Sequence, residues 1–250
     1  MENILNDMPG VIVRVDDILV TGRTDEEHIK KLEIVLDRLQ NKGMKLQKSK
    51  IQFMLNEVEY NGFTISKNGD KPTVKKVEAI HAAESPTNIT ELPSFIGLAN
   101  YLRNFVPNFA EIVSPLYNLL KKETKWKWGK DENNSFNRLK DAICAEKVLK
   151  RYDPNSELVL QTDASGVGVG AAILQYNENG FLQPIAYASR ILNKSENNYP
   201  QIERELLAVV FGVIKFRLFV LGRKFLLQTD HKPLTKICNE HEMITQLTSN

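Results

Sequence analysis

Two short apolar runs follow Pro9-Gly10 near the start of the chain. The runs are Val11–Val15 and Ile18–Val20, and they flank Asp16 and Asp17. β-Rich segments on either side of a two-residue polar turn are typical of a β-hairpin. The pattern therefore predicts a hairpin with both carboxylates at its tip, and an ordinary Asp-Asp turn is the alternative.

A helical pattern follows over residues 28–39. Thr24 is suited to the N-cap, Glu27 occupies the last position of a capping box, and Gly43 provides a stop. Apolar residues recur at helical spacing and predict one buried stripe, made of Ile29, Leu32, Leu36 and Leu39.

Lysines surround a second predicted strand pair at residues 58–65. Three precede the pair (Lys45, Lys48 and Lys50) and three follow it (Lys71, Lys75 and Lys76). The three that follow form a locally basic patch, and such a patch can neutralise the phosphates of a nucleic acid. A solvated helix face is the alternative.

Residues 78–125 are predicted to be helical and to connect the two halves of the chain. The expected buried stripe consists of Leu92, Phe95, Ile96, Ala99, Leu102 and Val106. Pro93 is tolerable there if Thr90 caps the helix and costly if Asn88 does.

Lysines then interleave with Trp126 and Trp128, a pattern that can stack bases and bind phosphates. Packing of the tryptophans in a core is the alternative. Phe136, Leu139 and Ile143 indicate a further helix.

The next apolar run, residues 158–163, predicts a buried strand that ends on Asp163. Gly166, Gly168 and Gly170 are expected to turn the chain tightly into an antiparallel partner. Residues 171–176 and 182–189 then form a predicted hairpin across the Asn-Glu-Asn-Gly turn at 177–180.

A helix is predicted over residues 201–219. Its larger apolar side chains are expected to be buried: Leu206, Val209, Val210, Val213 and Ile214. Glu205 shares a face with Ala208 and Gly212, and these small residues would let the helix lie close to the sheet. Glu205 would then reach Asp163, and a pair with Arg204 or contact with solvent is the alternative.

Residues 224–230 repeat the ending of the earlier strand, because Leu-Gln-Thr-Asp closes both segments. The predicted order is three antiparallel strands, a helix and a strand parallel to the first, with another helix from His231 onward. Two parallel strands that end on Thr-Asp place Asp163 and Asp230 at one edge of a sheet. This is the outline of a metal site.

Composition and charge narrow the function classes. The chain has 250 residues, enough for one large or two small domains, and 42% of them are hydrophobic. A net charge of +2 gives no global argument for nucleic-acid binding, so any such argument rests on local clusters. Two separate cysteines, Cys144 and Cys238, suit a reducing compartment. With no signal pattern and no apolar run long enough to span a membrane, we expect a soluble cytoplasmic protein.

The first half resembles the palm of reverse transcriptases from Ty3/gypsy-type LTR retrotransposons. The resemblance is carried by Val-Asp-Asp-Ile-Leu-Val at 15–20, Lys-Ser-Lys at 48–50 and Val-Glu-Tyr-Asn-Gly-Phe-Thr-Ile-Ser-Lys-Asn-Gly at 58–69. It continues through Ser-Phe-Ile-Gly-Leu-Ala-Asn-Tyr at 94–101 and Phe-Val-Pro-Asn-Phe at 105–109. It implies that Asp16 and Asp17 bind catalytic metal and that the Gly62 hairpin grips the primer.

The second half resembles the ribonuclease H of the same family, through Thr-Asp-Ala-Ser at 162–165, Glu-Leu-Leu-Ala-Val at 205–209 and Thr-Asp-His-Lys-Pro-Leu at 229–234. The resemblance implies that Asp163, Glu205 and Asp230 are catalytic metal ligands. Phosphodiester hydrolysis suits two Mg²⁺ ions roughly 4 Å apart, which oxygen ligands hold and Mn²⁺ can replace. The order Asp, Glu, Asp favours ribonuclease H over the integrases of the same fold.

The expected fold is therefore a mixed α+β and α/β architecture in three parts. These are the end of a reverse transcriptase palm (1–77), a helical thumb or connection (78–125) and a ribonuclease H-like mixed sheet with helices (126–250). Expected partners are primer-template nucleic acid, an RNA/DNA hybrid and other parts of the pol polyprotein. Nucleic-acid contacts are expected from Lys45, Lys48, Lys50, Gly62, Trp126, Trp128 and His231.

Both sites look incomplete against the family pattern. The family's other polymerase aspartate and its fingers precede the acidic hairpin, but only fifteen residues precede Asp16 here, and Arg14 replaces the usual aromatic residue. The fourth ribonuclease H carboxylate lies beyond a further strand and helix, and Glu240 and Glu242 follow Asp230 too soon to replace it. We expect a fragment that does not polymerise DNA alone. A non-catalytic nucleic-acid-binding module and a decayed product without function are the alternatives to an active ribonuclease H.

Overall fold

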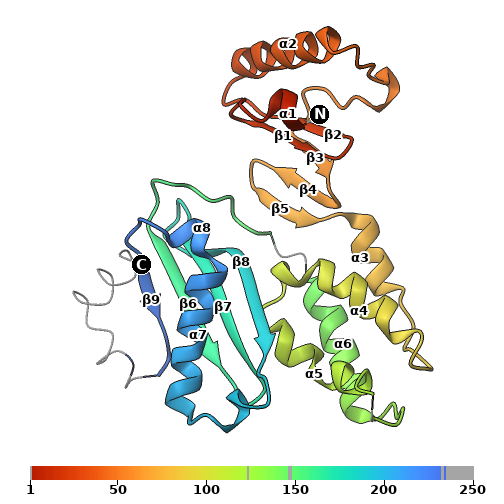
Figure 1. The fold of residues 1–250 in the computed structure, drawn as a ribbon, viewed down its shortest axis with the longest axis vertical. Coiled ribbons are helices and arrows are strands. Elements are labelled where there is room, and N and C mark those ends of the chain that lie inside the picture. Colours follow the sequence, from red (N-terminus) through yellow and green to blue (C-terminus); the bar gives the residue numbers. More distant parts are fainter. Residues whose placement is uncertain (1, 123, 146–147, 232–233, 235–250) are drawn as a thin grey trace. The chain divides into compact units, whose positions relative to one another are not determined.

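The computed structural model describes residues 2–122, 124–145, 148–231 and 234. The chain divides into two compact units, Met1–Lys67 and Asn68–Asn250 (Figure 1). None of the described helices is both long and apolar enough to cross a membrane. The predicted domain boundaries at 77/78 and 125/126 and the cytoplasmic location stay predictions.

The first unit contains two hairpins and one long helix. In chain order its elements are α1 (Glu2–Leu5), β1 (Val11–Arg14), β2 (Asp17–Val20), α2 (Asp25–Asn41), the 3-10 helix η1 (Lys48–Lys50), β3 (Glu57–Tyr60) and β4 (Phe63–Ser66). Strands β1 and β2 pair antiparallel, as do β3 and β4. Its small core is formed by Leu5, Met8, Val35 and Leu39.

The predicted stripe of α2 is partly wrong. Val35 and Leu39 are buried, but Ile29 and Leu36 are exposed. Apolar residues occur on more than one face of this helix, so their spacing alone does not identify the face that packs. At its start, Thr24 accepts a hydrogen bond from the Glu27 N–H at 3.2 Å, whereas the Glu27 carboxylate bonds the N–H of Arg23.

The second unit contains a helical part followed by a mixed sheet. Its elements are β5 (Gly69–Pro72), α3 (Val74–His81), α4 (Leu92–Tyr101), η2 (Arg103–Phe105), α5 (Phe109–Leu119), α6 (Lys130–Cys144), β6 (Leu158–Ala164), β7 (Gly168–Tyr176), β8 (Leu182–Ile191), η3 (Glu196–Asn198), α7 (Gln201–Lys215), α8 (Arg217–Val220) and β9 (Leu226–Gln228).

The helical part confirms the predicted stripe, since all six of its residues, from Leu92 to Val106, are buried. The three apolar residues predicted for α6 are buried as well. The N-cap of α4 is Glu91 rather than Thr90 or Asn88, so Pro93 lies in the first turn, where a missing N–H breaks no helical hydrogen bond.

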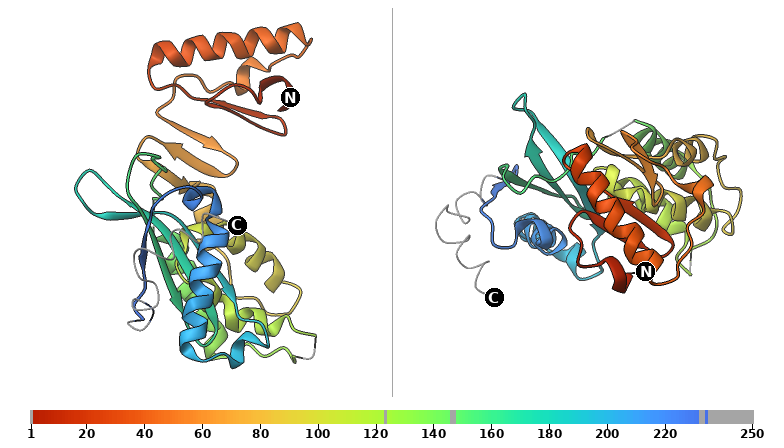
Figure 2. Two further views of the ribbon diagram at one scale, coloured as in Figure 1. Left: turned by 60° about the vertical axis from the view of Figure 1, so that its left-hand side comes forward. Right: turned by 90° about the horizontal axis from the view of Figure 1, so that it is seen from above.

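The sheet has the predicted topology, with strand order β8-β7-β6-β9. Strands β8, β7 and β6 are antiparallel, while β9 runs parallel to β6. Helix α7 crosses one face of this sheet (Figures 1 and 2). It lies close, because a Cβ added at Gly212 would be 3.1 Å from the Ala171 Cβ and 3.2 Å from the Leu160 Cδ1.

The burial predicted for the 201–219 helix is mostly wrong. The buried residues of α7 are Glu205, Ala208, Val209 and Gly212, whereas Leu206, Val210 and Ile214 are exposed. Close packing on the sheet selects the face with small side chains, and the larger ones on other faces turn away. The helix also ends at Lys215, and α8 is separate.

Of the three glycines after Asp163, Gly166 lies in the predicted turn between β6 and β7, but the other two have a different role. Gly168 and Gly170 lie inside β7 rather than in the turn. A Cβ at Gly168 would lie 2.7 Å from the Arg190 carbonyl oxygen, and a Cβ at Gly170 would lie 2.8 Å from Asn108 Oδ1. These positions therefore need glycine because neighbouring segments approach the strand closely.

Candidate metal centre

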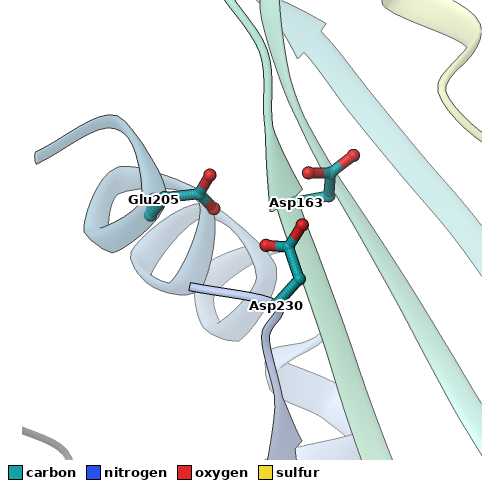
Figure 3. A group of neighbouring side chains, drawn as sticks. All are labelled: Asp163, Glu205 and Asp230. Carbon is teal, nitrogen blue, oxygen red and sulfur yellow. The ribbon is translucent and has the colours of Figure 1, made fainter. Parts of the chain in front are cut away.

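Three carboxylates from three separate elements converge at one edge of the mixed sheet (Figure 3). Asp163 is near the end of β6, Glu205 is on α7, and Asp230 follows β9 by two residues. One ligand oxygen from each lies within 4.8 Å of the other two. Asp163 and Asp230 lie close together because β6 and β9 are parallel neighbours. The predicted proximity of these two carboxylates is therefore confirmed.

Glu205 is the buried member of this cluster, with 3% of its surface exposed. Its Oε1 accepts a hydrogen bond from Gln201 Nε2 at 2.7 Å, while its Oε2 is buried with no partner. Burial raises the pKa of the Glu205 carboxyl, and the charges of Asp230 and Asp163 raise it further, against the opposing effect of Gln201. The alternative pair with Arg204 does not form, since Arg204 donates to the Tyr199 carbonyl.

This arrangement fits a divalent cation. Hard ions such as Mg²⁺ and Mn²⁺ prefer carboxylate oxygens, and all three side chains supply them. A buried carboxylate oxygen without a donor costs free energy unless a cation or water satisfies it. The unpartnered Oε2 of Glu205 therefore fits a position that faces a metal ion.

The helical part of the second unit borders this centre. The N–H of Ala110 on α5 donates to Ser189 Oγ on β8 at 2.8 Å. This contact brings Asn108 to Gly170, the β7 residue that pairs with Asp163. A groove of about 390 Å³ opens there, and its lining includes Asn108, Asp163 and Asp230.

The acidic hairpin of the first unit differs from its prediction. Arg14 pairs with Asp17, so the two-residue turn is Val15-Asp16 and Asp17 is already the first residue of β2. Val15 takes a φ of 54°, which strains a β-branched residue. Asp16 and Asp17 are both exposed. Among the described residues, they join no third acidic, histidine or cysteine side chain in a metal-binding group.

The predicted nucleic-acid contacts are scattered over both units. Lys45, Lys48 and Lys50 are exposed, and Gly62 lies in the β3–β4 turn with a φ of 72°. His231 follows Asp230 directly, and its Nδ1 is buried without a partner. No contact with a nucleic acid tests these roles, and they stay predictions.

The two tryptophans stack on each other, with ring centroids 5.9 Å apart. Trp128 also meets Phe136 edge-on at 5.9 Å, which supports the packing alternative for Trp128. Both tryptophans are half-buried.

Sequence reasoning missed Gln201. It lies four residues before Glu205, which places the two side chains on one helix face. This four-residue spacing is the feature of the sequence that could have identified Gln201 as a partner of Glu205. Cys238, Glu240 and Glu242 lie outside the described residues, and so does most of the helix predicted from His231 onward.

Two family models match separate parts of the chain. Residues 1–65 match "Reverse transcriptase (RNA-dependent DNA polymerase)", and residues 128–227 match "RNase H-like domain found in reverse transcriptase".

Similar curated proteins are transposon polyproteins. The chain is 38% identical over 245 residues to the retrovirus-related Pol polyprotein from transposon 297 of Drosophila melanogaster, which covers 97% of this chain and 23% of that protein. It is 32% identical over 235 residues to the transposon Tf2-3 polyprotein of Schizosaccharomyces pombe. This match covers 93% of this chain and 18% of that protein. The chain thus spans less than a quarter of the length of either relative.

Solved structures of the foamy viral protease-reverse transcriptase are also similar. The complex with double-stranded DNA has a TM-score of 0.79 at 31% identity and covers 94% of this chain and 42% of that one. The complex with an RNA/DNA hybrid has a TM-score of 0.77 at 30% identity, and the match covers 99% of this chain and 35% of that one. These likenesses confirm the predicted fold class.

Proposed function

Because the chain belongs to the retrotransposon pol polyproteins, with parts of a reverse transcriptase and of its ribonuclease H-like domain, we propose that its second unit hydrolyses the RNA strand of RNA/DNA hybrids. The observation that carries this proposal is the cluster of Asp163, Glu205 and Asp230, which brings three carboxylates from β6, α7 and the segment after β9 within 4.8 Å. The family supports the reaction class, and the geometry supports the choice of residues.

Each carboxylate has a distinct position in the proposed site. Asp163 and Asp230 are exposed at the sheet edge, where a phosphodiester from solvent can approach them. Glu205 closes the inner side with its unpartnered oxygen. Bound Mg²⁺ ions, or Mn²⁺ in their place, would activate a water and neutralise charge on the leaving oxygen. The two-ion arrangement is part of this proposal.

The first unit is proposed to belong to the polymerase site of the longer polyprotein. Asp16 and Asp17 would bind metal together with other parts of that protein, and Gly62 and the nearby lysines would contact primer-template nucleic acid. The exposure of all three lysines supports this role.

The test is cleavage of a labelled RNA/DNA hybrid by the full chain with Mg²⁺ or Mn²⁺. Asp163→Asn keeps the size of the side chain but removes the charge that holds the metal. We expect it to lower the cleavage rate by more than about 100-fold. Removal of a residue that only supports a metal ligand lowers activity by up to about 100-fold, and loss of a ligand itself should cost more.

Glu157→Gln is the matched control, since it removes a charge from an exposed residue just before the opposite end of β6. It should cleave like the wild type. Full cleavage by Asp163→Asn would contradict the assignment. Salt-sensitive hybrid binding without cleavage by a folded wild type would instead favour a non-catalytic binding module.

A further inference from the structure

Gln201, the first residue of α7, links two elements of the candidate metal centre. Its Nε2 donates to the carbonyl oxygen of Ala164 at 3.0 Å and to Glu205 Oε1 at 2.7 Å. Ala164 is the last residue of β6 and directly follows Asp163. One amide group therefore connects the strand that carries Asp163 with the helix that carries Glu205.

This contact restrains the Glu205 side chain. Glutamate has several rotatable bonds, and a ligand that samples many rotamers loses conformational entropy when it binds a metal. Among the described residues, Gln201 is the hydrogen-bond donor to Glu205, and the other carboxylate oxygen is unpartnered. With Oε1 held, the carboxylate faces Asp163 and Asp230 (Figure 3).

The bond to Ala164 fixes Gln201 in turn. A donor anchored at one end to a strand backbone is oriented before any metal arrives. Hydrogen-bond partners of metal ligands commonly contribute about 10–100-fold to metal affinity or activity through this kind of orientation.

We propose that Gln201 is a positioning residue that orients Glu205 toward a divalent cation shared with Asp163 and Asp230. The inference rests on the proposed metal site and adds a residue to it. Gln201 touches the metal site through Glu205, so its removal should weaken metal binding before any nucleic acid is present.

The experiment measures the binding of Mn²⁺ alone to the full chain, by electron paramagnetic resonance of the free ion and by calorimetry. Gln201→Met keeps a similar length but has no donor, and we expect its Mn²⁺ affinity to fall by about 10–100-fold. Gln201→Asn keeps the amide on a side chain one methylene shorter, so it should fail to bridge both acceptors and should also bind weakly.

Glu203→Gln is the matched control, because this residue is exposed in the same first turn of α7. It should leave the Mn²⁺ affinity unchanged. Circular dichroism without metal should show that every variant is folded and melts cooperatively.

The outcomes separate the inference from the function on which it rests. Equal Mn²⁺ affinity of wild type and Gln201→Met, with Asp163→Asn weakened, overturns the role of Gln201 alone. Unchanged Mn²⁺ affinity with weaker binding of an RNA/DNA hybrid also overturns it and assigns Gln201 to nucleic-acid contact. A folded wild type that binds Mn²⁺ no better than Asp163→Asn overturns the proposed metal site and the inference together.

Discussion

Glu205 and Glu196 are both buried carboxylates whose surroundings push their pKa values in opposite directions. Glu196 accepts two hydrogen bonds from Arg190, at 2.6 and 2.9 Å, and one from the N–H of Asn193. The Arg190 hydrogen bonds, followed by the one from Asn193, lower the pKa of Glu196, whereas burial raises that of Glu205. The difference in donors marks Glu196 as part of a structural ion pair and leaves Glu205 with capacity for a ligand.

The lowered pKa of Glu196 predicts a pH-dependent contribution to stability. A carboxyl whose pKa is lower in the folded than in the unfolded state stabilises the fold above its ordinary value of 4.5, and this contribution is lost as the pH falls through the folded pKa. Glu196→Gln should lower the free energy of unfolding by about 1–3 kcal/mol at pH 7. The difference from wild type should shrink below the ordinary pKa.

Urea unfolding at neutral and acidic pH measures this difference. Glu178→Gln, at an exposed site in the β7–β8 loop, controls for the loss of one charge. A difference between Glu196→Gln and wild type that stays constant with pH would show that the pair does not depend on the ionised carboxylate.

At the scale of elements, the distance between α7 and the sheet determines where Glu205 lies. Gly212, two turns after Glu205, faces Ala171, Leu160 and Thr162, and an added Cβ would lie 3.1–3.2 Å from atoms of all three. Helix α7 can approach β6 and β7 this closely only because it has no side chain at that position.

Gly212→Ala should therefore push α7 away from the sheet. Overpacking destabilises a fold by about 1–3 kcal/mol. Alanine in place of glycine stabilises a helix by about 1 kcal/mol, so we expect a modest net loss of stability. The displacement of Glu205 should also weaken Mn²⁺ binding. Denaturant melts and Mn²⁺ titration measure the two effects.

Gly97→Ala is the matched comparison, because Gly97 is also inside a helix but an added Cβ there would meet nothing within 4 Å. It should stabilise the protein by up to about 1 kcal/mol and leave Mn²⁺ binding unchanged. If Gly212→Ala stabilises the chain as much as Gly97→Ala, close packing does not set the position of α7.

At the scale of the whole molecule, the near-balanced charge limits how nucleic acid can bind. A net charge of +2 provides little long-range attraction, so binding depends on individual lysines. If Lys48 contacts a phosphate, Lys48→Ala should reduce the slope of log affinity against log salt by about 0.9. Titration of a labelled RNA/DNA hybrid or primer-template at several salt concentrations measures this slope.

Lys30→Ala, at an exposed position on α2, tests whether any lysine on the first unit has the same effect. It should leave the slope unchanged. Equal slopes for both variants and wild type would assign Lys48 to a solvated surface that contacts no phosphate.

The sequence alone determined the features that depend on neighbouring residues. The Asn-Glu-Asn-Gly turn at 177–180 predicts a hairpin, the stripe from Leu92 to Val106 predicts a buried helix face, and the repeated Leu-Gln-Thr-Asp endings predict a pair of adjacent carboxylates. Turn residues and periodicity act over a few positions of the chain, so they can be read without knowing what lies elsewhere.

Which helix faces pack and which residues support the metal centre depend on contacts that form in the folded protein. Helices α2 and α7 carry apolar residues on several faces, and the face that is buried depends on the partner surface. Residues 168 and 170 must be glycine because Arg190 and Asn108 approach the strand closely at these positions. Gln201 is held in place because its amide donates a hydrogen bond to the Ala164 carbonyl oxygen. Each of these contacts joins residues far apart in the chain, and their proximity arises only when the sheet and helices assemble.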